Sequence, residues 1–175
     1  MDIEVRGVLL QALKEAFPAI TSIVGPELGK FFEDVDPGGW YEGRAYFETM
    51  AFLRNHISPQ AMIHIGNRLL DELKTAFPPL GTSSPREMAH RVADFHDFFV
   101  RGAGAGGWRL EDYEPGRAVI AEDSPFSNPL LAAGIIRGGL ENTGAYNVRI
   151  EVLNDRSEGA SENRYLVEWI HPSGE

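Results

Sequence analysis

One histidine lies where its side chain could bind a ligand instead of facing solvent. The surrounding segment, 84–100, carries apolar residues at helical spacing: Met88, Val92, Phe95 and Phe99. His96 stands four residues from both Val92 and Val100, so its imidazole lies along the flank of this apolar stripe. An imidazole in that position is either a core residue with one hydrogen-bond partner or a ligand of a group bound in the core. The spacing leaves both interpretations open.

The segment that carries His96 has strong signals for a helix. Ser84 is a favourable N-cap, Pro85 suits the first helical position, and Glu87 stands three residues after the cap. Ser84 and Glu87 therefore form the sequence pattern of a capping box. We predict one continuous helix over 84–100, which leads directly into the C-terminal half of the chain.

The other residues that could perform catalysis are not arranged as catalysis requires. His90 and His96 point to different sides of a helix and do not form a metal set with His64. Ser124 lacks the strand–turn–helix context of an activated serine nucleophile, and the carboxylates show no spacing typical of an acid–base pair. The chain has no cysteine, which excludes disulfides, thiolate metal sites and iron–sulfur clusters. We therefore predict a protein that is not an enzyme.

Length and charge narrow the classes of partner. A chain of 175 residues predicts a single domain, 1–175, which is long enough to bury a core without covalent staples. The net charge of −10 opposes binding to the phosphate backbone of a nucleic acid. No charged-then-apolar leader opens the chain, and no apolar run approaches the length of a membrane span. The expected location is the cytoplasm.

The first half of the chain is predicted to be helical. Apolar periodicity indicates helices over 3–16, 27–33, 44–55 and 58–75, followed by 84–100. Trp40 and Tyr41 fall in a loop rich in glycine and proline, where we expect them to close an edge of the core. Gly66 lies in the middle of a helix at a cost of about 1 kcal/mol relative to alanine. That cost indicates either close contact with a neighbouring helix or ligand, or a helix whose solvent-facing side is disordered at this position.

The second half carries the patterns of an antiparallel sheet. Residues 108–113 and 117–122 predict a hairpin, 129–141 a helix, and 146–153 and 165–169 two further strands. Gly134 and Gly138 lie on one face of the helix, where small residues let it pack closely on a sheet. The predicted fold class is α+β, with a helical N-terminal half packed on a four-stranded antiparallel sheet of ββαββ order.

This order of elements, with short matching stretches along nearly the whole chain, resembles the haem–nitric oxide/oxygen binding (H-NOX) family. The stretches are Arg6-Gly7-Val8-Leu9 with Leu13, the helix after Ser58-Pro59 with Gly66, Phe95-His96-Asp97, and Gly134-Ile135-Ile136-Arg137. The resemblance implies that His96 is the proximal iron ligand of a haem. Cofactor-binding walls would come from Val92, Phe95, Phe99 and, in the N-terminal helix, Leu9.

The chain departs from that family where the haem propionates would be held. The family's Tyr-x-Ser-x-Arg pattern corresponds to 121–125, in which Ala121, Asp123 and Pro125 stand at the three positions. Glu122 and Asp123 bring carboxylates to this stretch, and carboxylates repel propionates. Arg44, Arg109, Arg117 and Arg137 are candidate replacements for the missing cation.

A related group also matches the predicted architecture. The 4-vinyl reductase-type domains, thought to bind small apolar molecules, have a pattern similar to Asp123-Ser124-Pro125-Phe126 before a glycine-bearing helix. Their cysteine-bearing metal cluster has no counterpart in a chain without cysteine. The group offers a haem-free version of the same fold.

Two functions therefore compete, and both describe a non-catalytic sensory or ligand-binding domain. In the first, haem bound through His96 takes up a diatomic gas such as nitric oxide and signals to a protein partner. In the alternative, a haem-free domain binds a small apolar molecule or another protein, and His96 is a core histidine. The sequence places haem first, because His96 is in register on an apolar helix face.

Overall fold

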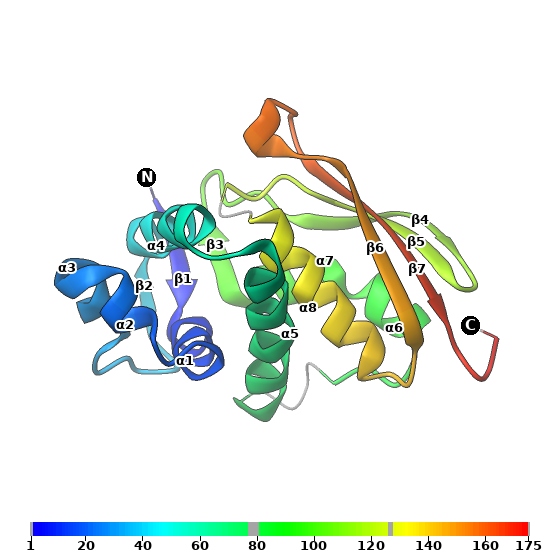
Figure 1. Ribbon diagram of the computed structural model, residues 1–175, viewed down its shortest axis with the longest axis horizontal. Coiled ribbons are helices and arrows are strands. Elements are labelled where there is room, and N and C mark those ends of the chain that lie inside the picture. The colour runs from blue at the N-terminus through cyan, green and yellow to red at the C-terminus, as the bar shows by residue number, and fades with distance from the viewer. Residues whose placement is uncertain (1, 77–80, 126–127, 175) are drawn as a thin grey trace.

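The computed structural model describes residues 2–76, 81–125 and 128–174. A group of N-terminal helices lies at one end of the molecule and a twisted sheet at the other (Figure 1). Helices α5 (Pro59–Ala76) and α8 (Pro129–Glu141) pack on each other between them, with α8 also contacting the sheet. The predicted α+β class, with a helical half beside an antiparallel sheet, is confirmed.

The larger sheet has the strand order β4-β5-β7-β6, and all its pairings are antiparallel. Its strands are β4 (Trp108–Glu114), β5 (Arg117–Glu122), β6 (Tyr146–Asn154) and β7 (Asn163–Ile170). Tyr165, Val167 and Trp169 are buried and alternate with more accessible residues, as a sheet with one wet face requires. The predicted ββαββ order, with α8 between the hairpins, is confirmed.

A second, smaller sheet joins segments that are distant in sequence, and it was not predicted. It has the order β2-β1-β3, with antiparallel pairings throughout. Its strands are β1 (Ile3–Arg6), β2 (Trp40–Glu42) and β3 (Val100–Gly102). The predicted helix over 3–16 was therefore wrong at its start, because Ile3 and Val5 alternate with polar residues and pair with other strands. Trp40 and Tyr41 are half-buried strand residues instead of loop residues.

The remaining N-terminal elements are helical: the first begins later than predicted, at Gly7, and the helix predicted over 44–55 extends one residue further at each end. They are α1 (Gly7–Ala16), α2 (Ile20–Ile23), α3 (Gly25–Gly29), the 3-10 turn η1 (Lys30–Phe32) and α4 (Gly43–His56). The helix predicted over 27–33 is divided between α3 and η1. Within the described residues, none of the helices combines the length and apolar character that crossing a bilayer requires.

Helices α5 and α8 cross at glycines from both partners. A Cβ added to Gly66 would lie 2.2 Å from the carbonyl oxygen of Leu131, and one added to Gly134 would lie 2.1 Å from that of Ile63. Gly66 therefore has the close helix contact that was one of its two predicted roles. Gly134 and Gly138 face α5, so the prediction that they pack on the sheet was wrong. The backbones approach closely because no side chain separates them.

The predicted helix over 84–100 is two helices, α6 (Pro85–His90) and α7 (Val92–Phe99). Arg91, with φ −102° and ψ 8°, breaks the helical path between them. Ser84 caps α6 as predicted, since its Oγ accepts the Glu87 N–H at 3.2 Å. The Glu87 carboxylate does not return to Ser84; it accepts hydrogen bonds from the backbone N–H and hydroxyl of Ser83 at 2.8 and 2.7 Å.

The segment that these two helices form runs from one hydrophobic core to another. Met88 and Val92 belong to a core formed by the larger sheet, α6 and α8. Phe99 and Val100 belong to a second core, formed mainly by α1, α4 and α5. His96, in α7, lies between Val92 of the first core and Phe99 of the second.

Candidate ligand-binding site

A cavity of about 110 Å³ lies between the two cores. Its walls come from α1, α4, α5, α6, α7, α8, the small sheet and the first two strands of the larger one, and most of the residues in them are apolar. The volume is of the order of an engineered cavity of about 150 Å³ that binds benzene. Pockets for drug-sized ligands are larger, roughly 300–1,000 Å³. The space therefore suits a molecule of a few non-hydrogen atoms.

The imidazole of His96 lines this cavity and is only 6% exposed. Its Nδ1–H donates a hydrogen bond to Oδ1 of Asp97 at 3.2 Å. Its Nε2 is buried and has no hydrogen-bond partner among the described residues. A hydrogen on Nδ1 leaves a lone pair on Nε2, which can accept a hydrogen bond or bind a metal. Histidine ligands of metals commonly make the same second bond, from the other ring nitrogen to a carboxylate.

The residues predicted to surround His96 also reach the cavity. The structure places all four of these wall residues in its lining: Leu9, Val92, Phe95 and Phe99. Leu9 comes from α1 and the others from α7, so the lining spans a long stretch of sequence. Their part in binding remains a prediction, because lining a cavity shows position and not occupancy.

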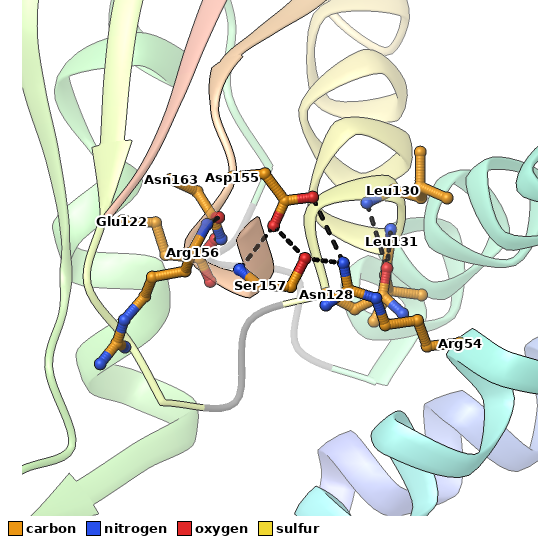
Figure 2. Close-up of polar contacts among 9 residues, drawn as sticks. All are labelled: Arg54, Glu122, Asn128, Leu130, Leu131, Asp155, Arg156, Ser157 and Asn163. Atoms are coloured by element: carbon orange, nitrogen blue, oxygen red, sulfur yellow. Dashed lines mark hydrogen bonds and ion pairs between the residues drawn. The ribbon is translucent and has the colours of Figure 1, made fainter. Parts of the chain in front are cut away.

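One part of the lining is polar, and it centres on Glu122 at the end of β5. The Glu122 carboxylate is almost fully buried, at 4% exposure of the residue. It accepts hydrogen bonds from the Tyr165 hydroxyl at 2.8 Å and from Nδ2 of Asn163 at 3.4 Å. Glu122 and Asn163 are opposite each other in the pairing of β5 with β7, and Figure 2 shows the two side chains close together. The pairing of the strands thus places a carboxylate and its donors beside the cavity.

Asn128 adds a hydrogen-bond donor to the cavity lining. Its Oδ1 accepts the backbone N–H groups of Leu130 and Leu131 at 3.1 and 3.2 Å, which caps the N-terminus of α8 (Figure 2). Because both of these partners are donors, the side-chain atom that faces them must be the oxygen. The amide nitrogen Nδ2 then points away from the cap. It is buried and has no hydrogen-bond partner in the part of the chain that the structure describes.

Tyr46, from α4, completes the polar part of the lining. Burial raises the pKa of its phenol above the ordinary value, and the negative charge of Glu122 raises the pKa further. The phenol therefore stays protonated at any physiological pH. Tyr46 and Asn128 were not predicted as site residues. An asparagine before a proline does signal a helix cap, but no spacing relates either residue to His96.

A chain of polar contacts connects the Glu122 carboxylate to the C-terminal end of α4 (Figure 2). Oδ1 of Asn163 accepts the backbone N–H of Arg156 at 2.8 Å, in the 3-10 turn η3 (Arg156–Glu158) between β6 and β7. Oδ2 of Asp155, the residue before Arg156, lies 3.3 Å from Nη2 of Arg54. The same nitrogen contacts the Ser157 hydroxyl. The helical half and the sheet are thus joined by charge as well as by packing.

The stretch 121–125 does not provide a cationic clamp. Of its two carboxylates, only Glu122 lines the cavity. Asp123 is exposed and accepts the backbone N–H of Gly107 at 2.7 Å. The expectation that both acids stand at this position was therefore wrong for Asp123. Ser124 is buried in the lining, and Phe126 lies outside the described residues.

The four arginines considered as replacements lie elsewhere. Arg44 bonds Glu48, Arg109 bonds Glu111 and Glu162, Arg117 bonds Asp112, and Arg137 bonds the Val148 carbonyl. None of them lines the cavity, and neither does any other lysine or arginine that the structure describes. The four candidates for a replacement clamp therefore lie outside the lining of this cavity.

Comparison with known proteins finds similar folds among solved structures but no relative by sequence. No family model matches the chain, and no curated protein is significantly similar to it. Among solved structures, an H-NOX protein from S. oneidensis in the Fe(II)NO ligation state superposes with a TM-score of 0.70 at 10% identity, over 95% of this chain and 99% of that one. The Fe(II) unliganded H-NOX protein from K. algicida gives 0.68 at 10% identity, over 95% and 97%.

A third structure, from work described as probing haem distortion in the H-NOX family, gives a TM-score of 0.68 at 11% identity, over 95% of this chain and 93% of that one. The chain therefore has an H-NOX-like fold, as the sequence resemblance implied. Identities this low establish the fold alone. What the cavity binds has to be argued from the residues of this chain.

The described residues meet only one of the requirements for haem. The unpartnered Nε2 of His96 suits an axial iron ligand. Haem also requires positive charge near its two propionates. The described lining of the cavity contains no lysine or arginine, and it does contain the buried carboxylate of Glu122. The volume of about 110 Å³ is also too small for a porphyrin. As arranged, these residues do not fit haem.

Proposed function

We propose that this chain is a non-catalytic sensory domain that binds a small, largely apolar molecule in the cavity beside His96, without haem. The observation that carries the proposal is a cavity at the junction of two cores, with apolar walls and a buried His96 whose Nε2 has no hydrogen-bond partner in the described part of the chain. Buried polar groups in folded proteins are almost always hydrogen-bonded. A buried nitrogen that has no partner among the described residues, in a side chain that lines a cavity, therefore supports a binding site there.

The position of the cavity supports a sensory role. Its lining includes residues of both cores, such as Leu9 of α1 and Ala132 of α8. A molecule that contacts both cores stabilises one relative arrangement of the two halves over others. The contact between Arg54 and Asp155 joins the same two halves at the surface. We propose that a protein partner binds preferentially to the arrangement of the two halves that the ligand stabilises.

The same geometry supports the non-catalytic part of the proposal. Ser124 and His96 both line the cavity, and Asp97 bonds the imidazole, which superficially resembles a serine nucleophile with its base. A serine nucleophile must donate its hydroxyl hydrogen to the base. Nε2 of His96 receives no hydrogen bond from Ser124, so the serine is not activated.

Native mass spectrometry of the freshly purified full chain tests the proposal. We expect a small non-covalent adduct, or binding of added benzene detected by ligand-observed NMR. Ala132→Leu fills the cavity from α8 and should abolish binding while the protein stays folded by circular dichroism. Ala51→Leu is the matched control, because Ala51 is exposed on α4. Binding that survives Ala132→Leu unchanged would contradict a site in this cavity.

Haem is the second candidate, and the geometry of His96 is the observation in its favour. It would require the cavity to widen and the propionates to find another cation. Titration with haemin under reducing and oxidising conditions distinguishes the candidates. A Soret band that disappears in His96→Ala would establish haem and displace the haem-free proposal. No band, or one that His96→Ala leaves unchanged, is the result we expect.

A further inference from the structure

The cavity presents polar groups of defined hydrogen-bonding character, and these restrict the chemical class of its ligand. Nε2 of His96 carries a lone pair, because Nδ1 donates to Asp97. Nδ2 of Asn128 is a donor, because Oδ1 is committed to the cap of α8. Both atoms are buried without a protein partner among the described residues. A ligand that satisfies both must donate one hydrogen bond and accept another.

The charge in the lining excludes one class that could otherwise meet this requirement. Glu122 is buried beside the cavity, and none of the described lining residues is a lysine or arginine. A carboxylate or phosphate ligand would leave water for an apolar space that already contains a carboxylate. Its own charge would have no opposite partner there, and such burial is very costly.

A cationic ligand is a poorer match than a neutral one, for two reasons. An ammonium group offers only donors, so Nδ2 of Asn128 would stay without an acceptor. The Glu122 carboxylate already accepts hydrogen bonds from Tyr165 and Asn163. A neutral group that both donates and accepts meets both requirements, and a hydroxyl is the smallest such group for a cavity of this size.

Resting on the proposed function, we propose that the ligand is a small neutral alcohol or phenol, held at its hydroxyl by His96 and Asn128, and that Glu122 excludes carboxylate analogues. The volume of about 110 Å³ limits the apolar body to about the size of one aromatic ring. Phe95, Phe99 and Trp108 provide flat surfaces in the lining against which such a ring packs.

Two matched pairs of probes test the class by isothermal titration calorimetry or ligand-observed NMR. Phenol should bind about ten-fold more tightly than benzene, because benzene leaves both polar atoms unsatisfied. 1-Butanol should bind, and butyrate, of similar size, should not. Butylammonium binding more tightly than 1-butanol would overturn the neutral class.

Three variants assign the roles. Asn128→Ser retains a capping hydroxyl for α8 but removes the amide donor, and His96→Phe retains a ring of similar size without the acceptor. Each should weaken phenol binding about ten-fold and leave benzene binding unchanged. Glu122→Gln should allow butyrate to bind. Circular dichroism and thermal denaturation of each variant report whether it is folded, and benzene binding reports whether the cavity is intact.

The outcomes separate this inference from the proposed function. If benzene binds but phenol binds no more tightly, the cavity is a site and the hydroxyl assignment is wrong. If Asn128→Ser and His96→Phe leave the preference for phenol intact, other groups determine it and the assignment is again wrong. If none of the probes binds the folded protein and no adduct co-purifies with it, the proposed function itself fails.

Discussion

At the scale of single residues, the molecule places several polar groups in an apolar interior and satisfies them unequally. Glu122 accepts hydrogen bonds from Tyr165 and Asn163, whereas Nδ2 of Asn128 has no partner among the described residues. Leaving a buried polar atom without a partner costs roughly 1–3 kcal/mol. Among the described residues, His96 Nε2 and Asn128 Nδ2 are two such atoms, and both residues line the same cavity. A bound molecule that pairs with them would recover it.

The hydroxyl of Tyr165 is predicted to be essential to the burial of Glu122. Tyr165→Phe keeps the ring, which is fully buried, but removes the 2.8 Å hydrogen bond to the carboxylate. We expect the free energy of unfolding, measured with urea, to fall by about 1–3 kcal/mol. Tyr146→Phe is the control, because Tyr146 is 53% exposed. An equal loss in both variants would show that the Glu122 contact is not the cause.

At the scale of elements, helix α7 and the crossing of α5 with α8 fix the position of the cavity. Met88 of α6 and Val92 at the start of α7 belong to the core of the sheet, whereas Phe99 at the end of α7 belongs to the core of the helical half. The glycines at the crossing bring α8 close to α5, so that Leu131 and Leu70 line the same space. The size of the cavity thus depends on backbone spacing as well as on side chains.

A methyl group at the crossing is predicted to destabilise the fold. In Gly66→Ala the new Cβ meets the Leu131 carbonyl oxygen at 2.2 Å, and a backbone atom cannot rotate away. Overpacking of this kind costs about 1–3 kcal/mol or more, against a gain in helix propensity of about 1 kcal/mol. Urea unfolding should show a net loss of about 1–2 kcal/mol. Gly107→Ala should be neutral, because a Cβ there meets nothing within 4 Å.

The contact between Arg54 and Asp155 is predicted to stabilise the protein in a pH-dependent way. Burial acts to raise the pKa of Asp155, but its hydrogen bonds to Ser157 and the charge of Arg54 outweigh burial, and the pKa lies below the ordinary 3.8. A lowered folded pKa gives stability that is present above the unfolded value and is lost as the pH falls through the folded value.

Asp155→Asn should therefore cost roughly 0.5–1 kcal/mol at neutral pH, as expected for a partly exposed ion pair. The difference from the wild type, followed by urea unfolding at a series of pH values, should shrink as the pH falls below 3.8. Arg44→Gln is a control, because its ion pair with Glu48 lies within α4 and does not join the two halves. A difference that stays constant down to the lowest pH would exclude the Asp155 charge as its source.

The sequence predicted the elements whose patterns are long. The strands of the larger sheet, helix α8 and most of α4 and α5 were located from periodicity and caps. The small sheet was missed, because strands of three or four residues contain too few positions to establish a period. The break at Arg91 was missed because the apolar spacing continues through it. His96 and its predicted apolar neighbours were found because they share one helix face or the opening motif.

The polar part of the site could not be predicted in the same way. Glu122, Asn128 and Tyr46 come from a strand end, a helix cap and a distant helix, and only the pairing of β5 with β7 and the docking of α4 bring them together. No local sequence pattern indicates that these three residues lie near one another. Their meeting is a property of the tertiary structure.

At the scale of the whole molecule, the protein has two hydrophobic cores with a cavity between them. A ligand in this cavity should stabilise the elements of both cores. We expect saturation with phenol to raise the free energy of unfolding by about 2.7 kcal/mol at a hundred times its Kd. Amide hydrogen exchange should slow in α1, α7 and α8 together, because Leu9, His96 and Leu131 share the lining. Protection confined to α7 would contradict a ligand that connects the two cores.

The reciprocal fit of Gly66 and Gly134 has a consequence for how this sequence can vary. Each residue leaves room for a main-chain oxygen of the opposite helix, so a larger residue at either position forces the helices apart whatever stands at the other. Neither substitution can rescue its counterpart, and descendants of this protein should retain both or lose the chamber between the cores.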